Sequence, residues 1–102
     1  MSYNILELDV IRWAEARRII PNSTPLAQAI KTTEEVAELL KALSRGDMAE
    51  AKDAYGDILV TLIIGAALAD VDLMDCLEQA YETIKHLKGY LTKDGIFVKE
   101  EQ

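Results

Sequence analysis

The chain has 102 residues, of which half are hydrophobic and only two are proline, so the composition favours one folded domain over a disordered segment. Its formal net charge at pH 7 is −7 and no stretch is strongly basic, which argues against nucleic-acid wrapping and against binding to an anionic membrane. An acidic protein can still bind a triphosphate where Mg²⁺ bridges the negative charges.

The remaining composition points to the cytoplasm. The single cysteine, Cys76, cannot form a disulfide within the chain, which is typical of a reducing compartment. The N-terminus lacks the basic start and apolar run of a signal peptide. The apolar stretch after Asp57 is about a dozen residues long, against the roughly 20 that a membrane-spanning helix needs. We therefore expect a cytoplasmic protein that binds neither membranes nor nucleic acids.

The first half of the chain predicts two helices. Residues 3–20 carry apolar side chains at helical spacing, and Pro-Asn-Ser at residues 21–23 ends this first helix. Thr24 followed by Pro25 is a helix start signal, because it places an N-cap residue before a proline in the first turn. The second helix is expected to run from there to about residue 44, with Gly46 as its C-terminal cap.

The second predicted helix carries an acidic stripe. A helix places Lys31, Glu35 and Glu38 on one face, one turn apart, with Glu34 at the edge of that face. Like charges at this spacing cost a few tenths of a kcal/mol unless a cation lies between them. The apolar residues lie on the opposite side of the helix, so the stripe taken alone is interpreted as a solvent-exposed surface.

The third predicted helix changes that interpretation. Asp47 is its expected N-cap, and residues 58–69 are apolar on every side apart from Thr61, so we expect them to be buried on every side. Asp53 and Asp57 lie one turn apart where this apolar part begins, and a carboxylate near a core must be paired, neutralised or metal-bound. Acids from two neighbouring helices can surround a hard cation such as Mg²⁺.

The C-terminal part predicts a fourth helix and a short tail. Residues 72–75 form a variant capping box, and the helix that follows is expected to end near Leu91. Asp94 and Gly95 predict a turn, and residues 96–98 a short extended segment, within a tail of residues 94–102. The apolar residues of the fourth helix alternate steps of four and three, as in a coiled-coil seam: Leu73, Leu77, Ala80, Ile84, Leu87 and Leu91.

Four helices with short connections predict an all-α fold, a four-helix bundle-like protomer in a single domain of residues 1–102. Three partner helices from so short a chain cannot easily cover the apolar third helix. We therefore expect a homo-oligomer, either a dimer or a tetramer, with a compact monomer built around the third helix as the alternative.

Residues 34–38 read Glu-Glu-Val-Ala-Glu, and Asp57 follows on the next helix. Together with Trp13-Ala14, with Lys31 and with residues 56–59 and 80–100, this pattern resembles the MazG-like, all-α nucleoside triphosphate pyrophosphohydrolases, in particular their small phage and bacterial members. The first run is similar to the family's EExxE motif, and Asp57 falls at the aspartate of its ExxD motif.

Two positions depart from the family's pattern. The glutamate of ExxD falls on Ala54, so one of four metal-binding carboxylates is missing, and either Asp53 or the more distant Glu50 could replace it. Leu87 stands where the family has a downstream arginine, which leaves Lys85 and Lys88 as the basic candidates.

The resemblance implies an enzyme that uses Mg²⁺, or Mn²⁺, to hydrolyse a nucleoside triphosphate, including deoxy forms, to the monophosphate and pyrophosphate in a house-cleaning or nucleotide-pool role. A catalytically weakened nucleotide- or metal-binding oligomer and a purely structural oligomer are the alternatives. Each lysine is otherwise an ordinary surface residue, and Trp13 fits a core or interface equally well. The implied site residues are Glu35, Glu38 and Asp57 for catalysis and metal binding, Asp53 and Glu34 as further metal ligands, and Lys31, Trp13, Lys85 and Lys88 for substrate binding.

Overall fold

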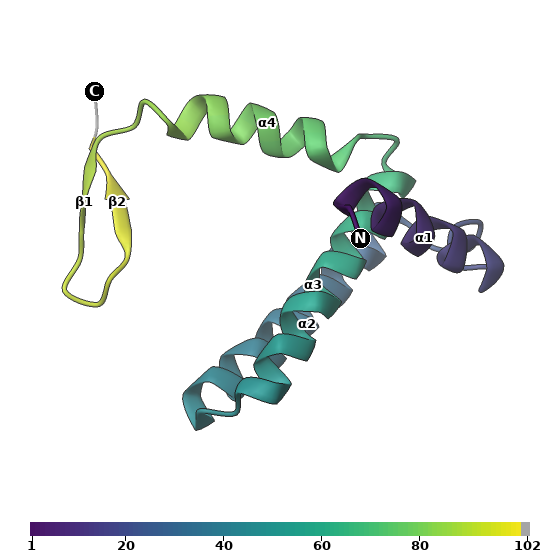
Figure 1. The fold of residues 1–102 in the computed structure, drawn as a ribbon, viewed down its shortest axis with the longest axis horizontal. Coiled ribbons are helices and arrows are strands. Elements are labelled where there is room, and N and C mark those ends of the chain that lie inside the picture. Colours follow the sequence, from purple (N-terminus) through teal and green to yellow (C-terminus); the bar gives the residue numbers. More distant parts are fainter. Residues whose placement is uncertain (101–102) are drawn as a thin grey trace.

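A computed structural model describes residues 1–100, so the last two residues of the predicted tail lie outside the described part. Four helices are followed by a small antiparallel hairpin of two strands (Figure 1). The predicted all-α class and its four helices are confirmed. The elements are α1 (Tyr3–Ala16), α2 (Pro25–Arg45), α3 (Met48–Leu68), α4 (Leu73–Ile84), β1 (Gly89–Leu91) and β2 (Phe97–Lys99).

Helices α2 and α3 form an antiparallel pair whose ends are specified by local sequence. The Thr24 hydroxyl accepts a hydrogen bond from the Ala27 amide at 3.0 Å and caps α2. Gly46 ends α2 in the left-handed conformation, at φ 71°, which glycine adopts without a steric penalty. The Asp47 carboxylate then accepts from the Glu50 amide at 3.1 Å and caps α3. The predicted caps of both helices are therefore confirmed.

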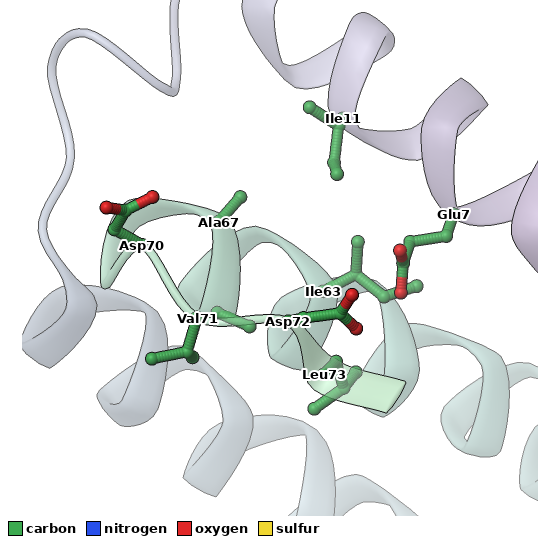
Figure 2. Close-up of a pocket in the computed structure, with 9 residues that line it drawn as sticks. Glu7, Ile11, Ile63, Ala67, Asp70, Val71, Asp72 and Leu73 are labelled. Atoms are coloured by element: carbon green, nitrogen blue, oxygen red, sulfur yellow. The ribbon is translucent and has the colours of Figure 1, made fainter. Parts of the chain in front are cut away.

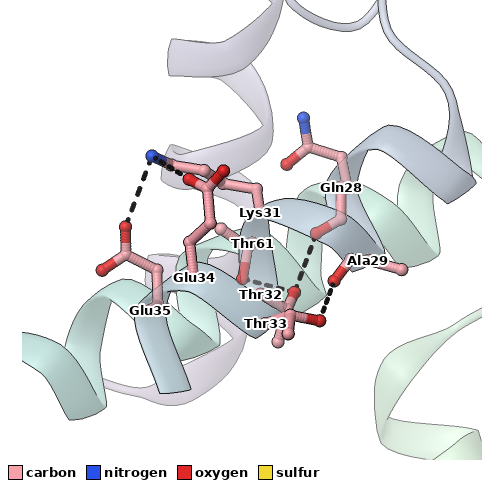
Figure 3. A network of polar contacts seen from close by, with 8 residues as sticks. All are labelled: Gln28, Ala29, Lys31, Thr32, Thr33, Glu34, Glu35 and Thr61. Atoms are coloured by element: carbon pink, nitrogen blue, oxygen red, sulfur yellow. Dashed lines mark hydrogen bonds and ion pairs between the residues drawn. The ribbon is translucent and has the colours of Figure 1, made fainter. Parts of the chain in front are cut away.

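Small residues let α2 and α3 pack closely. A Cβ atom added at Gly65 of α3 would lie 3.3 Å from the Cβ atom of Gln28 on α2. The hydroxyl oxygens of Thr32 and Thr61 lie 2.7 Å apart across the same interface (Figure 3). Thr61 is only 7% exposed, and its hydroxyl also lies 2.8 Å from the Ile58 carbonyl oxygen. A buried polar side chain is therefore satisfied while it joins the two helices.

Helix α1 ends at Ala16, earlier than the predicted residue 20. Arg18 adopts a left-handed conformation, at φ 63°, and the Ile19 amide donates to the Ala14 carbonyl at 2.8 Å. These interactions turn the chain before the prolyl segment is reached. The helix lies across the C-terminal end of α3 (Figure 1).

Helix α4 begins as predicted but ends at Ile84, so the expected continuation to Leu91 was wrong. The Asp72 carboxylate caps the helix by accepting from the amides of residues 74 and 75. Gly89 then starts β1 and pairs with Lys99 of β2. A Cβ atom at Gly89 would lie only 2.1 Å from the Val98 carbonyl oxygen, so this close approach requires glycine. The predicted turn at residues 94 and 95 connects the strands, with Gly95 at φ 86°.

The four helices do not close into a bundle within one chain. Helix α4 extends away from the α2–α3 pair (Figure 1), and among residues 1–100 its backbone approaches only α3. The expectation that α3 is buried on every side was also wrong, because Leu59 and Leu62 are 50% and 39% exposed. No helix in the described part is long and apolar enough to cross a bilayer.

The first prediction concerns the Thr32–Thr61 contact. Thr61→Val keeps the shape of the side chain but removes the buried hydroxyl, and we expect it to lower the free energy of unfolding by about 1 kcal/mol. Thr33→Val is the matched control, because the Thr33 hydroxyl is exposed and bonds only the Ala29 carbonyl of its own helix. The control should stay within about 0.5 kcal/mol of wild type in urea denaturation. Equal losses in both variants would contradict a specific role for the contact.

The second prediction concerns alkaline stability. The Tyr3 hydroxyl donates to Glu7 Oε2 at 2.7 Å, and burial, with help from this bond and the Glu7 charge, raises the pKa of Tyr3 from 10.0 to about 12. A raised folded-state pKa gives a stabilisation that is complete below pH 10 and is lost as the pH rises towards 12.

Over that range the melting temperature of Tyr3→Phe should therefore fall less steeply than that of wild type. Circular dichroism melts at a series of pH values measure this difference. Tyr90→Phe removes an exposed tyrosine as the control and should follow the wild-type curve.

Candidate active site

A cavity of about 450 Å³ lies among α1, α2 and α3 and brings four of the predicted site residues together. Trp13 comes from α1, Lys31 and Glu35 from α2, and Asp57 from α3. Its volume is within the range of small-molecule sites, and apolar residues of α3 form much of the remaining wall. The structure thus places acids, a cation and an aromatic ring around one space.

The α2–α3 register explains why two distant acids meet. Thr32 lies against Thr61, and in an antiparallel pair a step forward along one helix matches a step backward along the other. Glu35, three residues beyond Thr32, therefore lies at the level of residue 58 and beside Asp57. The short connection between α2 and α3 fixes this register. The number of residues between the two acidic motifs therefore determines that they lie side by side.

Lys31 lies between two glutamates on the rim of the cavity (Figure 3). Its Nζ atom is 3.1 Å from Glu34 Oε2 and 3.6 Å from Glu35 Oε1. The hydrogen bond to Glu34, then the negative charges of Glu34 and Glu35, raise the pKa of Lys31 above its usual value. The side chain of Glu35 is 17% exposed and that of Glu34 is 62% exposed, so Glu35 is the acid that faces the cavity.

The other predicted metal ligands lie outside the cavity lining. Glu38 is exposed one turn beyond Glu35, and Asp53 is exposed one turn before Asp57. Within residues 1–100, no three histidine, cysteine, aspartate or glutamate side chains are arranged to hold one ion. The two cavity carboxylates, Glu35 and Asp57, fit Mg²⁺, because this ion commonly takes one or two protein carboxylates and completes its shell with water and substrate phosphates.

Ala54, at the position of the missing motif glutamate, belongs to the core. It is 4% exposed, and Ala51 on the same face of α3 is fully buried. Small side chains here allow the close packing of α2 and α3. Residue 54 therefore takes part in packing, and the neighbouring Asp53 lies on the exposed side of α3.

Two predicted substrate-binding lysines lie far from the cavity of their own chain. Lys85 caps the C-terminal end of α4, and Lys88 follows it, on the part of the molecule that extends away from α1 and α2 (Figure 1). Lys85 Nζ is 2.6 Å from Glu82 Oε2 and 5.9 Å from the ring centroid of Tyr81. Within one chain, Lys31 is thus the predicted cation that lines the cavity.

Two residues near the cavity were missed in the sequence. A second hollow of about 350 Å³ shares Trp13 and Asp57 with the first and includes Asp9. The Arg17 guanidinium carbon lies 5.9 Å from the Trp13 ring centroid, within the range of a cation–π interaction. Asp9 and Arg17 stand four residues before and after Trp13, so a helical projection around this tryptophan would have found both.

A third hollow, of about 360 Å³, lies where α1 meets the connection between α3 and α4 (Figure 2). Glu7 and Asp72 contribute carboxylates to it, and the charges of both acids help to raise the pKa of Tyr3. Asp72 already caps α4, and Asp70 turns the chain just beyond the end of α3, at φ 57°. Structural roles therefore account for these acids.

Comparison with known proteins gives two matches. The model of the phosphoribosyl-ATP pyrophosphohydrolase family matches residues 19–83, which include all of α2 and α3. An uncharacterized 18.2 kDa protein from the rep-hol intergenic region of Haemophilus phage HP1 (strain HP1c1) is 34% identical over 64 residues. That alignment covers 63% of this chain but only 39% of the phage protein. No solved structure matches.

Proposed function

Because the chain belongs to the phosphoribosyl-ATP pyrophosphohydrolase family, within the MazG-like all-α superfamily, we propose that it hydrolyses a nucleotide between its α and β phosphates and releases pyrophosphate. We propose nucleoside triphosphates, deoxy forms included, as substrates, and a house-cleaning or nucleotide-pool role. The observation that carries the proposal is the single cavity shared by Trp13, Lys31, Glu35 and Asp57.

Lys31 is the proposed phosphate contact. A lysine ammonium group is charged at neutral pH, and it binds phosphate as a point charge. Glu34 and Glu35 hold this group in the structure, both within 3.6 Å. A phosphate that reaches Lys31 would compete with these carboxylates for the ammonium group.

Glu35 and Asp57 are the proposed metal ligands, with Glu38, Asp53 and Glu34 as further candidates on the rim. Bound Mg²⁺, or Mn²⁺, would neutralise phosphate charge and lower the pKa of an attacking water. Glu38 or Glu35 would accept the proton of that water, since a carboxylate can act as a general base through a bound water. Glu38 lies one turn from Glu35 on the same helix face, so either carboxylate can serve a water held at the rim.

Trp13 is the proposed contact for the nucleobase. The residue lines both adjoining hollows and is 45% exposed, so part of it is accessible to a ligand. Aromatic side chains suit this role because every base has a face that can stack. The Arg17 guanidinium restricts the orientation of the ring through its cation–π contact.

A nucleotide- or metal-binding protein with weakened turnover is the second candidate. Buried Ala54 favours it, because the chain lacks one motif carboxylate and Asp53 does not line the cavity in its place. Under either function we propose that the protein acts as a homo-oligomer, a dimer or a tetramer.

The third prediction tests catalysis. With Mg²⁺, the protein should release pyrophosphate from at least one member of a panel of deoxynucleoside triphosphates, ribonucleoside triphosphates and phosphoribosyl-ATP, and EDTA should stop the release. Glu35→Gln and Asp57→Asn should each lower kcat/KM by about 100-fold or more, because each removes one of the two cavity carboxylates. Glu38→Gln is expected to lower it as well.

Glu78→Gln on exposed α4 is the matched control and should retain wild-type activity. Circular dichroism of every variant checks that the fold is intact. Full activity in both Glu35→Gln and Asp57→Asn would remove the cavity from the mechanism. Nucleotide binding without pyrophosphate release from any member of the panel would favour the second candidate.

The fourth prediction uses the single tryptophan as a probe. A non-hydrolysable triphosphate added with Mg²⁺ should change the fluorescence of Trp13 in a saturable titration, because the base enters the space beside the ring. Asp57→Asn should shift the midpoint to a ligand concentration higher by about tenfold or more, since even an outer contact that orients a metal ligand is worth this much and Asp57 is proposed as a ligand itself. Binding detected by calorimetry without any change in Trp13 emission would place the base elsewhere.

A further inference from the structure

The hollow of about 350 Å³ beside the cavity, the Asp9 hollow, brings a different charge to Trp13. Lys31 and Glu35 line the cavity, whereas Asp9 lines the hollow. Trp13 and Asp57 belong to both spaces. One ligand can therefore contact the cavity and the hollow with different parts of its structure.

The Asp9 hollow is formed by one side of α1 against α3. Residues three and four positions apart lie on the same side of a helix, which brings four residues of α1 together here. Most of the lining is apolar, and this suits a flat ring that carries only a few polar groups. The lining residues are Leu6, Asp9, Val10 and Trp13 of α1 with Asp57 and Val60 of α3.

Asp9 can accept hydrogen bonds from a ligand in this hollow. The residue is exposed, and within residues 1–100 no basic side chain forms a salt bridge with its carboxylate. The Arg17 guanidinium of the same helical segment lies over the Trp13 ring instead. An ionised carboxylate only accepts hydrogen bonds, so Asp9 favours a ligand that presents N–H donors.

The charges of the two spaces impose an orientation on a nucleotide. Lys31 attracts phosphates to the cavity, where Glu35 and Asp57 are the proposed metal ligands. Asp9 repels phosphates, because like charges raise the energy of a complex when they come close together. The base is the part of the nucleotide that remains, and the hollow beside Trp13 is the space left for it.

The nucleobases differ in what they offer to a carboxylate. Cytosine, adenine and guanine each carry an exocyclic amino group, which donates hydrogen bonds. Uracil and thymine have a carbonyl oxygen in place of the amino group of cytosine, and their one ring N–H lies between two such oxygens. A carboxylate repels these oxygens, so it discriminates in favour of the amino-bearing bases.

We propose that Asp9 accepts a hydrogen bond from the amino group of a nucleobase in the Asp9 hollow and so selects amino-bearing nucleotides over those of uracil and thymine. This inference rests on the proposed function, because it assigns a place to the base of the nucleotide whose phosphates enter the cavity. Asp9 acts as a specificity residue, away from the phosphates that react.

The fifth prediction compares two matched pairs of non-hydrolysable deoxynucleoside triphosphates, cytosine with uracil and adenine with hypoxanthine. Within each pair a carbonyl oxygen replaces the amino group on a ring of the same size. Calorimetric titration of the full chain with Mg²⁺ should give a dissociation constant about tenfold or more lower for the amino-bearing member of each pair that binds. Binding is measured without turnover, so the result does not depend on catalytic activity.

Asp9→Asn keeps the shape of the side chain but gives it an N–H donor that can bond a carbonyl oxygen. We expect the preference to fall to about threefold or less in this variant, because both kinds of base then find a partner. Glu15→Gln is the matched control. It makes the same change of charge on α1 at an exposed residue that lines neither space, and it should keep the wild-type preference. Circular dichroism checks the fold of both variants.

Three results would overturn the role of Asp9 and leave the proposed function intact. They are equal affinity for both members of a pair in the wild type, an unchanged preference in Asp9→Asn, and an equal loss of preference in Glu15→Gln. The last would show an effect of overall charge. A wild-type protein that binds neither pair would remove the proposed function together with this inference.

Discussion

The close packing of α2 against α3 is the constraint on which the rest of the structure depends. Alanine and glycine at the interface let the two helices pack closely, and the hydroxyls of Thr32 and Thr61 meet in the register that the short connection fixes. This register places Glu35 beside Asp57. A change that slides one helix along the other would move Glu35 relative to Asp57, so the core packing and the candidate chemistry are linked.

Local signals in the sequence predicted the helix starts well, while the path of the chain after α4 was predicted poorly. Helix caps depend on short-range hydrogen bonds or on the backbone conformation of one residue, so the residue type alone indicates them. The caps predicted in this way are Thr24, Gly46, Asp47 and Asp72. The end of α4 was different. The four-and-three spacing of apolar residues continues past Ile84. However, the backbone of residues 89–91 pairs with β2 instead of continuing the helix. This pairing joins residues on either side of a turn, and the spacing of apolar residues along the sequence does not predict it.

The candidate site was predicted in part for the same reason. Trp13, Lys31, Glu35 and Asp57 surround one cavity because each lies on the side of a regular helix that borders it. The hypothesis that Asp53 replaces the missing glutamate receives no support from the geometry, since a one-residue shift rotates a side chain by about 100° around a helix. The lysines at 85 and 88 were grouped with the site on family resemblance alone, and the direction of α4 separates them from it.

Helix α3 explains how one short chain can carry a polar site and a large apolar surface together. Asp57 and Val60 face the cavity, whereas the exposed side chains of Leu59 and Leu62 face away from it. These sets alternate at helical spacing, so they occupy different faces of the same rod. The continuous apolar character of α3 predicted burial on every side, but one side of the helix lines the cavity and another is left exposed within one chain.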